Sequence, residues 1–185
     1  MRQVDLILVK RTDPQILDEM SRHYSQPKGF VGRNMCYKIV YNDISYGHIV
    51  SGSATRFLVG RDNFLGIDCL KFLNNIINNI FYHVEPKNGE YPFRNFTSSV
   101  LLQWEKRTVV DWEQKYGDKV IALESLIELP RSGETYKRAG WTLVGQTKGF
   151  TCKRIAGKGT DDWTGKRVWD TENLRPKLVF VKKVT

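Results

Sequence analysis

The sequence predicts a single α/β domain in which helices flank a mixed central sheet. Stretches with strand character alternate with helical stretches along most of the 185 residues, and this alternation indicates a sheet covered by helices. The length suits one domain with a sizeable core. Hydrophobic residues make up 41% of the chain and charged residues 26%, so we expect a packed domain with a polar surface rather than a disordered chain.

The first expected elements are a strand and a helix. Residues 3–9 are apolar and β-branched, as in a strand. Asp13 and Pro14 follow as a helix cap and a first helical residue, and apolar residues then recur at helical spacing. We therefore expect a helix that reaches Tyr24 and ends before the glycine-rich loop at 29–33.

A β-hairpin and a buried helix are expected next. Residues 35–41 and 44–52 have strand character, and the turn-forming pair Asn42–Asp43 separates them. From 65 to 80, apolar residues recur at intervals of three and four. This pattern predicts a buried helix that runs into a strand at 80–85.

The second half of the chain predicts one long helix and three strands. Residues 96–117 have helical character, with Asn95 or Thr97 as a cap at the start and Gly117 as a cap at the end. Further strands are expected at 119–125, 141–149 and 177–184, with a short helical turn in the loop 129–140.

Cysteine usage and hydropathy indicate a cytoplasmic protein. Cys36, Cys69 and Cys152 are odd in number and form no CxxC pair, which argues against a disulfide scaffold and against a zinc knuckle. No apolar run is long enough for a signal peptide or a membrane span. We therefore expect a reducing compartment and no membrane contact.

A positive charge favours a polyanionic partner. Lys and Arg number 29 against 20 Asp and Glu, a formal charge of +9, and counterion release then favours nucleic acid, DNA first.

We expect residues 1–150 to form the core and residues 151–185 to add a basic loop, rich in Trp and Gly, and a final strand of the same domain. A solvated basic face with buried tryptophans is the alternative. The residues expected to grip nucleic acid are Lys148, Lys153, Arg154, Lys158, Trp163, Lys166 and Arg167.

Five residues are candidates for acid–base chemistry. His23 and Tyr24 end the first predicted helix, beside the glycine-rich loop. Glu124 and Glu128 lie at the end of a predicted strand, where open α/β sheets bind ligands. Tyr136 lies in a loop that passes the same crevice and could donate a proton to a leaving group.

Each candidate also has a structural interpretation. The imidazole at the helix end could serve as a cap, and the glutamates could form a surface salt bridge to Arg131 or Lys137. Tyr136 could be a core aromatic. His48 and His83 fall within predicted strands without obvious partners, so we interpret both as structural.

Phosphate-binding motifs for nucleotides are absent from the sequence. It contains neither GxxxxGK[ST] nor a GxGxxG within a strand–helix unit, so ATP chemistry is not expected. The start of the long helix is the one place where free backbone N–H groups meet polar side chains that could hold a pyrophosphate, although Ser and Thr there are also ordinary caps. The candidate cofactor-binding residues are Arg94, Asn95, Ser98 and Ser99.

The order of elements resembles the acyl-CoA N-acyltransferase (GNAT) fold. The long helix after the fourth strand and the short helix before Gly140–Trp141 carry this resemblance. The Mom family of phage DNA-modification proteins is similar in HYS (23–25), in the serine at the start of the long helix and in GETYKRAGW (133–141). The DruA family of anti-phage proteins is similar over about residues 20–150, in the phrases GRDNFLGI, NNIINNIFYHVEP, DWEQKYGDKVIALES and SGETYKRAGWTLVGQTKG.

The resemblance to the Mom family implies a transferase. Such an enzyme converts the exocyclic amine of adenine in phage DNA to a carbamoylmethylated form, which protects the DNA from restriction. Acetyl-CoA or another acyl-CoA is the implied donor, and iron is implied as well, with His23 and a carboxylate as ligands. The residues placed at the base are His23, Tyr24, Glu124 or Glu128, and Tyr136, and those placed at the acyl-CoA are Ser98 or Ser99.

The resemblance to the DruA family implies a different function. Such a protein would bind nucleic acid in phage defence or counter-defence without an acyl donor. The GNAT pyrophosphate pattern, Arg/Gln-x-x-Gly-x-Gly/Ala, is missing between His83 and Asn95, which favours this alternative. A crevice that gathers His23, Glu124 and Tyr136 would favour the transferase.

Overall fold

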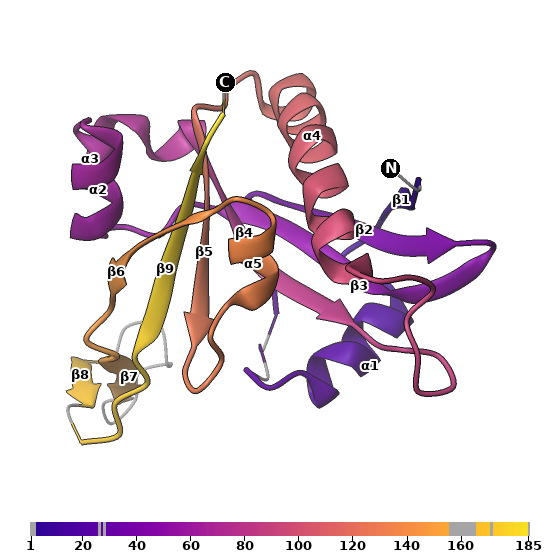
Figure 1. The fold of residues 1–185 in the computed structure, drawn as a ribbon. Coiled ribbons are helices and arrows are strands. Elements are labelled where there is room, and N and C mark those ends of the chain that lie inside the picture. Colours follow the sequence, from indigo (N-terminus) through magenta and orange to yellow (C-terminus); the bar gives the residue numbers. More distant parts are fainter. Residues whose placement is uncertain (1–2, 26, 28, 156–165, 171, 185) are drawn as a thin grey trace.

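Seven strands form one mixed sheet with helices on both of its faces (Figure 1). The computed structural model describes residues 3–25, 27, 29–155, 166–170 and 172–184. The sheet has the strand order β1-β2-β3-β4-β5-β9-β6, which confirms the predicted fold class. Its strands are β1 (Asp5–Val9), β2 (Asn34–Tyr41), β3 (Ile44–Ser53), β4 (Ile76–Val84), β5 (Ala122–Glu128), β9 (Lys177–Lys183) and β6 (Thr142–Gln146).

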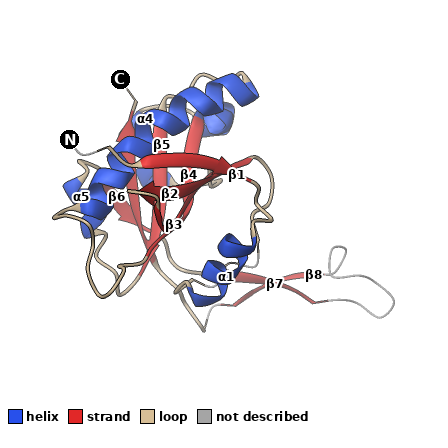
Figure 2. Ribbon diagram, turned by 90° about the vertical axis from the view of Figure 1, so that its right-hand side faces the viewer, coloured by secondary structure: helices blue, strands red, loops and turns tan. Residues whose placement is uncertain are grey.

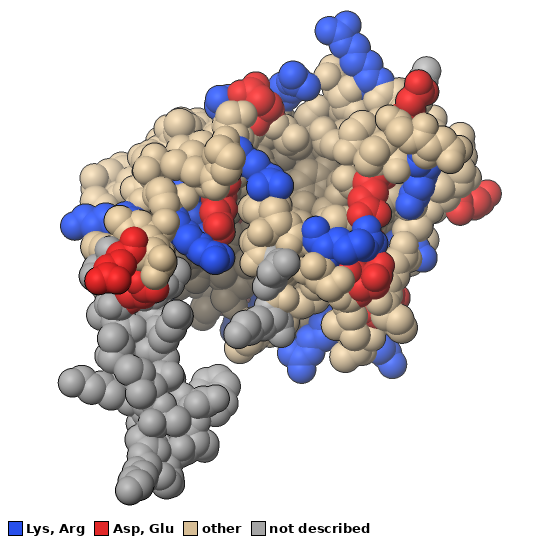
Figure 3. Space-filling model, turned by 90° about the horizontal axis from the view of Figure 1, so that it is seen from below, with Lys and Arg blue, Asp and Glu red and all other residues tan. Residues whose placement is uncertain are grey.

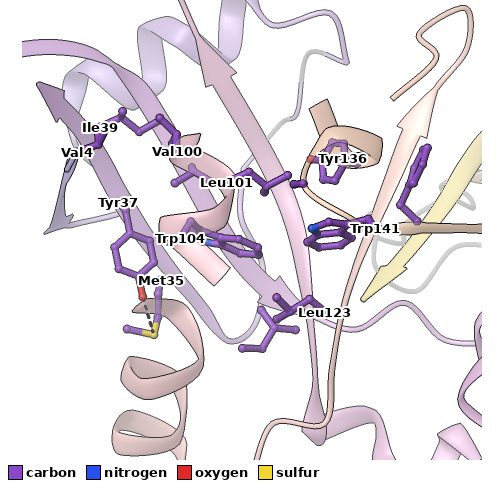
Figure 4. Close-up of a cluster of buried hydrophobic side chains, with 14 of the residues drawn as sticks. Val4, Met35, Tyr37, Ile39, Val100, Leu101, Trp104, Leu123, Tyr136 and Trp141 are labelled. Carbon is purple, nitrogen blue, oxygen red and sulfur yellow. Dashed lines mark hydrogen bonds between the residues drawn. The ribbon is translucent and has the colours of Figure 1, made fainter. Parts of the chain in front are cut away.

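The helices divide between the two faces of this sheet (Figures 1 and 2). They are α1 (Pro14–Arg22), α2 (Val59–Leu65), α3 (Cys69–Phe72), α4 (Phe96–Tyr116) and α5 (Glu134–Arg138), and a 3₁₀ turn covers Leu73–Asn75. α4 and α5 cover one face, where Trp104, Tyr136 and Trp141 belong to the largest cluster of buried side chains (Figure 4). α1 and α2 pack on the other face through two smaller clusters. The candidate site lies between the ends of β4 and β5, where an opening in the sheet connects the two faces.

Local sequence signals set several element boundaries as predicted. Asn42 and Asp43 both have positive φ, 49° and 61°, as a two-residue hairpin turn between β2 and β3 requires. The Asp13 side chain accepts a hydrogen bond from Gln15 N at 2.8 Å and caps α1. Gly117 ends α4 in the left-handed conformation, with φ 74°.

The helix predicted at 65–80 is wrong. That stretch contains the end of α2, then α3, the 3₁₀ turn and the first half of β4. β4 is a central strand between β3 and β5, and its first four residues, Ile76–Asn79, are all buried. A strand buried on both faces has no period-two alternation, so its apolar residues matched a helical spacing by chance.

Some element boundaries also differ from the predictions. α1 ends at Arg22, and His23 already has an extended backbone with φ −70° and ψ 141°. β5 begins at Ala122 and continues to Glu128, three residues past its predicted end. This shift decides which of the two candidate glutamates lies at the end of the strand.

The segment after Gly149 contains more regular structure than predicted. β7 (Thr151–Ile155) and β8 (Lys166–Asp170) form an antiparallel pair, where the sequence predicted a loop. The final strand, β9, lies between β5 and β6 in the main sheet and pairs with both. Among the described residues, no helix is both long and apolar enough to cross a membrane.

Candidate active site

β4 and β5 are parallel neighbours that separate towards their carboxyl ends (Figure 1). They pair only over Ile76–Asn79 and Ala122–Ser125, although β4 continues to Val84 and β5 to Glu128. A register shift between β3 and β4 leaves Ile80 without a partner residue opposite it, and such a bulge bends the strand. Beyond these residues, the edges of β4 and β5 that face each other therefore form no ladder with one another.

A cavity of about 660 Å³ occupies the space between the separated strands. Figure 3 views the molecule from below, the side towards which β5 runs in Figure 1, and shows basic and acidic side chains interspersed there rather than one continuous basic field. Four of the five predicted catalytic residues line the cavity: His23, Tyr24, Glu128 and Tyr136. Other lining residues include Arg22, His83, Arg131 and Lys177.

Glu124 does not line this cavity, so its predicted place in the crevice is wrong. Because β5 extends to Glu128, Glu124 lies in mid-strand, and its fully buried side chain accepts a hydrogen bond from Arg61 Nη1 at 2.5 Å. A second hydrogen bond comes from Thr55 N at 2.6 Å. Burial raises the pKa of Glu124, and the charge of Arg61 opposes this shift. The ion pair thus holds the segment before α2 against the β4–β5 junction.

His23 is buried at the cavity wall and is held in its neutral form. Its Nδ1 lies 2.8 Å from Ser25 Oγ, and its ring packs 4.7 Å from the ring of Phe81. Burial, and next the nearby His83, lower the pKa of His23 to about 4, against a weaker opposing hydrogen bond with the backbone of Tyr82. At neutral pH this imidazole therefore carries no charge.

The low pKa of His23 predicts a loss of stability in acid. In the unfolded chain the imidazole binds a proton below about pH 6.5, whereas in the folded chain it does so only near pH 4. The free energy of unfolding should therefore be highest above pH 6.5 and fall by about 3 kcal/mol between pH 7 and pH 4. Urea unfolding across this range measures the loss. In His23→Gln, the free energy of unfolding should fall by about 3 kcal/mol less over the same pH range. An equal fall in the two proteins would contradict this role of His23.

Tyr24 and Arg131 form one rim of the cavity. The Arg131 guanidinium lies over the Tyr24 ring, 3.6 Å from its centroid, a distance typical of a cation–π contact. Burial raises the pKa of Tyr24 and the charge of Arg131 opposes this shift. The pair joins the segment after α1 to the loop between β5 and α5.

Tyr136 presents a protonated hydroxyl at the cavity wall. Gly133 starts α5 with φ 70° and packs so closely on Phe180 that a Cβ there would lie 2.4 Å from that ring. From this turn Tyr136 reaches Asn79, donating its hydroxyl to Oδ1 at 2.5 Å. Burial raises the pKa of Tyr136. The side chain is thus a core aromatic whose hydroxyl lies at the cavity wall.

The sequence interpretation missed His83. Its Nε2 lies 2.8 Å from Glu85 Oε1, and Glu85 also pairs with Arg22. His83 lines the cavity from β4. A histidine and a glutamate two residues apart project from the same face of a strand, so the spacing in the sequence was a usable signal. From the sequence we interpreted His83 as structural, because we did not consider Glu85, within the same predicted strand, as a partner.

Comparison with known proteins identifies the fold. No family model and no curated protein sequence matches the chain. Solved structures match it over nearly its whole length. A Bacillus subtilis acetyltransferase in complex with CoA is 11% identical, with 99% of this chain and 100% of that chain covered and a TM-score of 0.58. A GNAT family acetyltransferase from Elizabethkingia anophelis with acetyl-CoA bound is 11% identical, with 98% of each chain covered and a TM-score of 0.55.

An N-acetyltransferase from Staphylococcus aureus is 10% identical, with both chains covered completely and a TM-score of 0.56. The chain has the GNAT acetyltransferase fold. This confirms the fold that the order of elements resembled. Neither a family model nor a curated sequence supports the resemblance to the Mom or DruA families.

Within this GNAT fold, the candidate cofactor residues lie at the start of α4 and do not line the cavity. Asn95 caps the helix in the left-handed conformation, and Ser98 Oγ donates to Asn95 O at 3.0 Å. Arg94 is exposed and Ser99 is half-buried. The Tyr82 hydroxyl of β4 donates to Thr97 O at 2.6 Å, which fixes the start of α4 beside the separated strand.

The expected nucleic-acid contacts are distributed over the segment after β6. Lys148 is exposed in the stretch before β7. Lys153 and Arg154 belong to β7, and Lys166 and Arg167 to β8. Lys158 and Trp163 lie outside the described residues. Their binding to nucleic acid stays a prediction.

The described residues do not fit the expected iron site. Among them, no three His, Cys, Asp or Glu side chains are grouped so that they could hold a metal ion. His23 Nδ1 is engaged with Ser25. We therefore derive no step through a metal.

Proposed function

We propose that the chain is an N-acyltransferase that takes its acyl group from acyl-CoA and uses the cavity between β4 and β5. The separation of these strands beyond Asn79 and Ser125 carries the proposal, because it opens a cavity at the carboxyl end of the sheet. Two structurally similar proteins were solved with CoA or acetyl-CoA. When bound, acyl-CoA supplies an acyl group on sulfur that an amine can attack.

The open edges of the strands suit an extended, amide-containing ligand. The backbone N–H and C=O groups of residues 80–84 and 126–128 that face the opening have no β4–β5 ladder partners. The Tyr82 and Glu128 backbones form hydrogen bonds with the His23 and Tyr24 side chains, and the remaining buried backbone groups need partners. An extended chain can satisfy them as an added strand would. Phe96 N–H donates to Phe93 O, but the next N–H groups in the first turn of α4 have no partner within the helix. With exposed Arg94 this turn suits a pyrophosphate. The residues present therefore fit acyl-CoA.

Tyr136 is the proton donor in this proposal. Its hydroxyl lies at the cavity wall on Asn79 Oδ1, and its raised pKa keeps it protonated at neutral pH. It can therefore protonate a leaving sulfur. Backbone N–H groups of β4 that have no partner on β5 can polarise the acyl carbonyl.

The acceptor that we propose is the exocyclic amine of a base in DNA, adenine first. The resemblance to the Mom family motivates this acceptor, and the product would protect phage DNA from restriction. The formal charge of +9 supports a polyanionic substrate. Arg131 and Lys177 line the cavity, and no ion pair joins either of them to a described residue. A base flipped out of a duplex would enter beside them.

A second candidate is a protein that binds nucleic acid without an acyl donor. The pyrophosphate pattern missing between His83 and Asn95 favours it, as does the absence of residues 94–99 from the cavity lining. This candidate predicts tight, salt-dependent DNA binding and no interaction with acetyl-CoA.

Thiol release from acetyl-CoA tests the proposed function. The amines offered are an adenine-containing oligonucleotide, a lysine peptide and an aminoglycoside, each analysed by mass spectrometry for an added acetyl group. The proposal predicts thiol release with one amine, the oligonucleotide first, and an equal amount of amide product. Acetylation of one of the other amines would contradict the choice of DNA as the acceptor but not the acyl transfer itself. No release with any amine, together with binding of the oligonucleotide, would establish the second candidate instead.

A further inference from the structure

We propose that His83 is the general base of the reaction and that Glu85 is the positioning residue that holds its tautomer. The inference rests on the proposed function and adds the group that removes the proton from the acceptor amine. It arises from the hydrogen-bonded pair at the outer end of β4, whose histidine lines the cavity.

The Glu85 carboxylate fixes which nitrogen of His83 carries the proton. His83 Nε2 lies 2.8 Å from Glu85 Oε1. Burial tends to raise the pKa of Glu85, but the hydrogen bonds and charges of His83 and Arg22 outweigh it and lower that pKa. The carboxylate therefore stays ionised and accepts the Nε2 hydrogen. In the neutral ring, the lone pair then belongs to Nδ1.

That lone pair is open to the cavity. No hydrogen bond joins His83 Nδ1 to a described residue. Buried side-chain polar atoms without a partner are confined, in the described part of the chain, to His48, Arg61, Asn78 and Trp112. His83 Nδ1 is not among them, and the residue lines the cavity. Its ring stacks on Phe81 at 5.9 Å and 11°, which holds the plane of the imidazole.

The other titratable groups around His83 are poor candidates for the general base. His23, 5.6 Å away between ring centroids, has a pKa of about 4 and a weak tendency to accept a proton. His48 lies directly opposite on β3, but it is fully buried and paired with Glu19 at 2.8 Å. Arg22 carries a permanent positive charge. His83 is therefore the accessible imidazole of this face.

The proposed step balances. His83 Nδ1 accepts the proton that the amine loses as its nitrogen bonds to the acyl carbon. The Tyr136 hydroxyl gives a proton to the sulfur as the carbon–sulfur bond breaks, so an amine and a thioester become an amide and a thiol. Solvent then takes the proton from His83 and returns one to Tyr136.

The pH dependence of turnover tests the dyad with a matched control. Arg22 pairs with both Glu85 and Asp18, but Glu85 alone contacts His83. With acetyl-CoA and the oligonucleotide, His83→Gln should lower kcat by about 10²-fold or more and remove the rise of kcat with pH. Glu85→Gln should lower kcat by about tenfold and shift that rise, with KM unchanged. Asp18→Asn should match wild type; a wild-type profile in His83→Gln would overturn the inference.

Chemical modification separates this inference from the proposed function. Diethyl pyrocarbonate acylates unprotonated, accessible imidazoles, and the chain has three histidines. Mass spectrometry should show His83 reacting fastest, more slowly in Glu85→Gln, and protected by acetyl-CoA. If His83 reacted no faster than His48, the proposed His83–Glu85 dyad would be overturned. A reactive His83 with no protection and no turnover would instead overturn the proposed function, and the catalytic role with it.

Discussion

Replacing Glu124 by glutamine is expected to lower the free energy of unfolding by about 3–5 kcal/mol. The glutamate and its partner Arg61 are both fully buried, so neutralising Glu124 leaves the buried guanidinium with only the partly exposed Asp62 as a counter-charge. Arg61 Nη1 also donates to Thr55 O at 2.6 Å, which ties the segment before α2 to the same pair. Urea unfolding at pH 7 measures the loss.

Two further variants make the Glu124 result specific. Removing both charges, as in Arg61→Met with Glu124→Met, should destabilise less than either single change, because neither fully buried charge remains. Glu134→Gln breaks an exposed pair with Lys137 and should leave the unfolding transition nearly unchanged. A loss below about 1 kcal/mol for Glu124→Gln would mean that the ion pair does not hold the β4–β5 junction.

Replacing Tyr136 by phenylalanine is expected to lower kcat for acyl transfer by about 10²-fold. The ring and its contacts with Trp141 and Phe180 would remain, so affinity for acetyl-CoA should change by no more than about twofold. The variant also leaves Asn79 Oδ1 without its donor, at a cost in stability of about 1–3 kcal/mol. Steady-state kinetics and calorimetry with acetyl-CoA measure the two effects separately.

Tyr91 provides the control for this substitution. Tyr91 does not line the cavity, and its hydroxyl donates to Val84 O at 3.2 Å, so Tyr91→Phe should keep the wild-type kcat. If Tyr136→Phe also turned over at the wild-type rate, the proton donor of the proposal would have to be another group.

The fold could be predicted from local signals where those signals act alone. The turn at Asn42–Asp43 and the cap at Gly117 require particular backbone conformations, and both were found. β4 could not be predicted in the same way. Its first half is buried by strands on both sides and by side chains above and below, so long-range contacts rather than residue alternation make it a strand.

The site was predicted in part for the same reason. Tyr136 and Glu128 line the cavity as expected, because Glu128 ends, and Tyr136 follows, a strand whose carboxyl end opens the sheet. Glu124 was predicted at the rim of the cavity because the predicted end of β5 was three residues too early. In the structure it lies in mid-strand. Its partner, Arg61, comes from α2, in the segment between β3 and β4, where no helix was predicted before residue 65. No spacing in the sequence relates the two residues.

Chemical-shift mapping with acetyl-CoA tests most directly the claim that the cavity between β4 and β5 binds the acyl donor. Amide resonances of the uniformly labelled protein are followed as acetyl-CoA is added. The account predicts saturable shifts concentrated in residues 80–84, 125–136 and the first turn of α4, with little change in α2 and α3. No shifts at millimolar acetyl-CoA, or shifts confined to elements away from the separated strands, would contradict it.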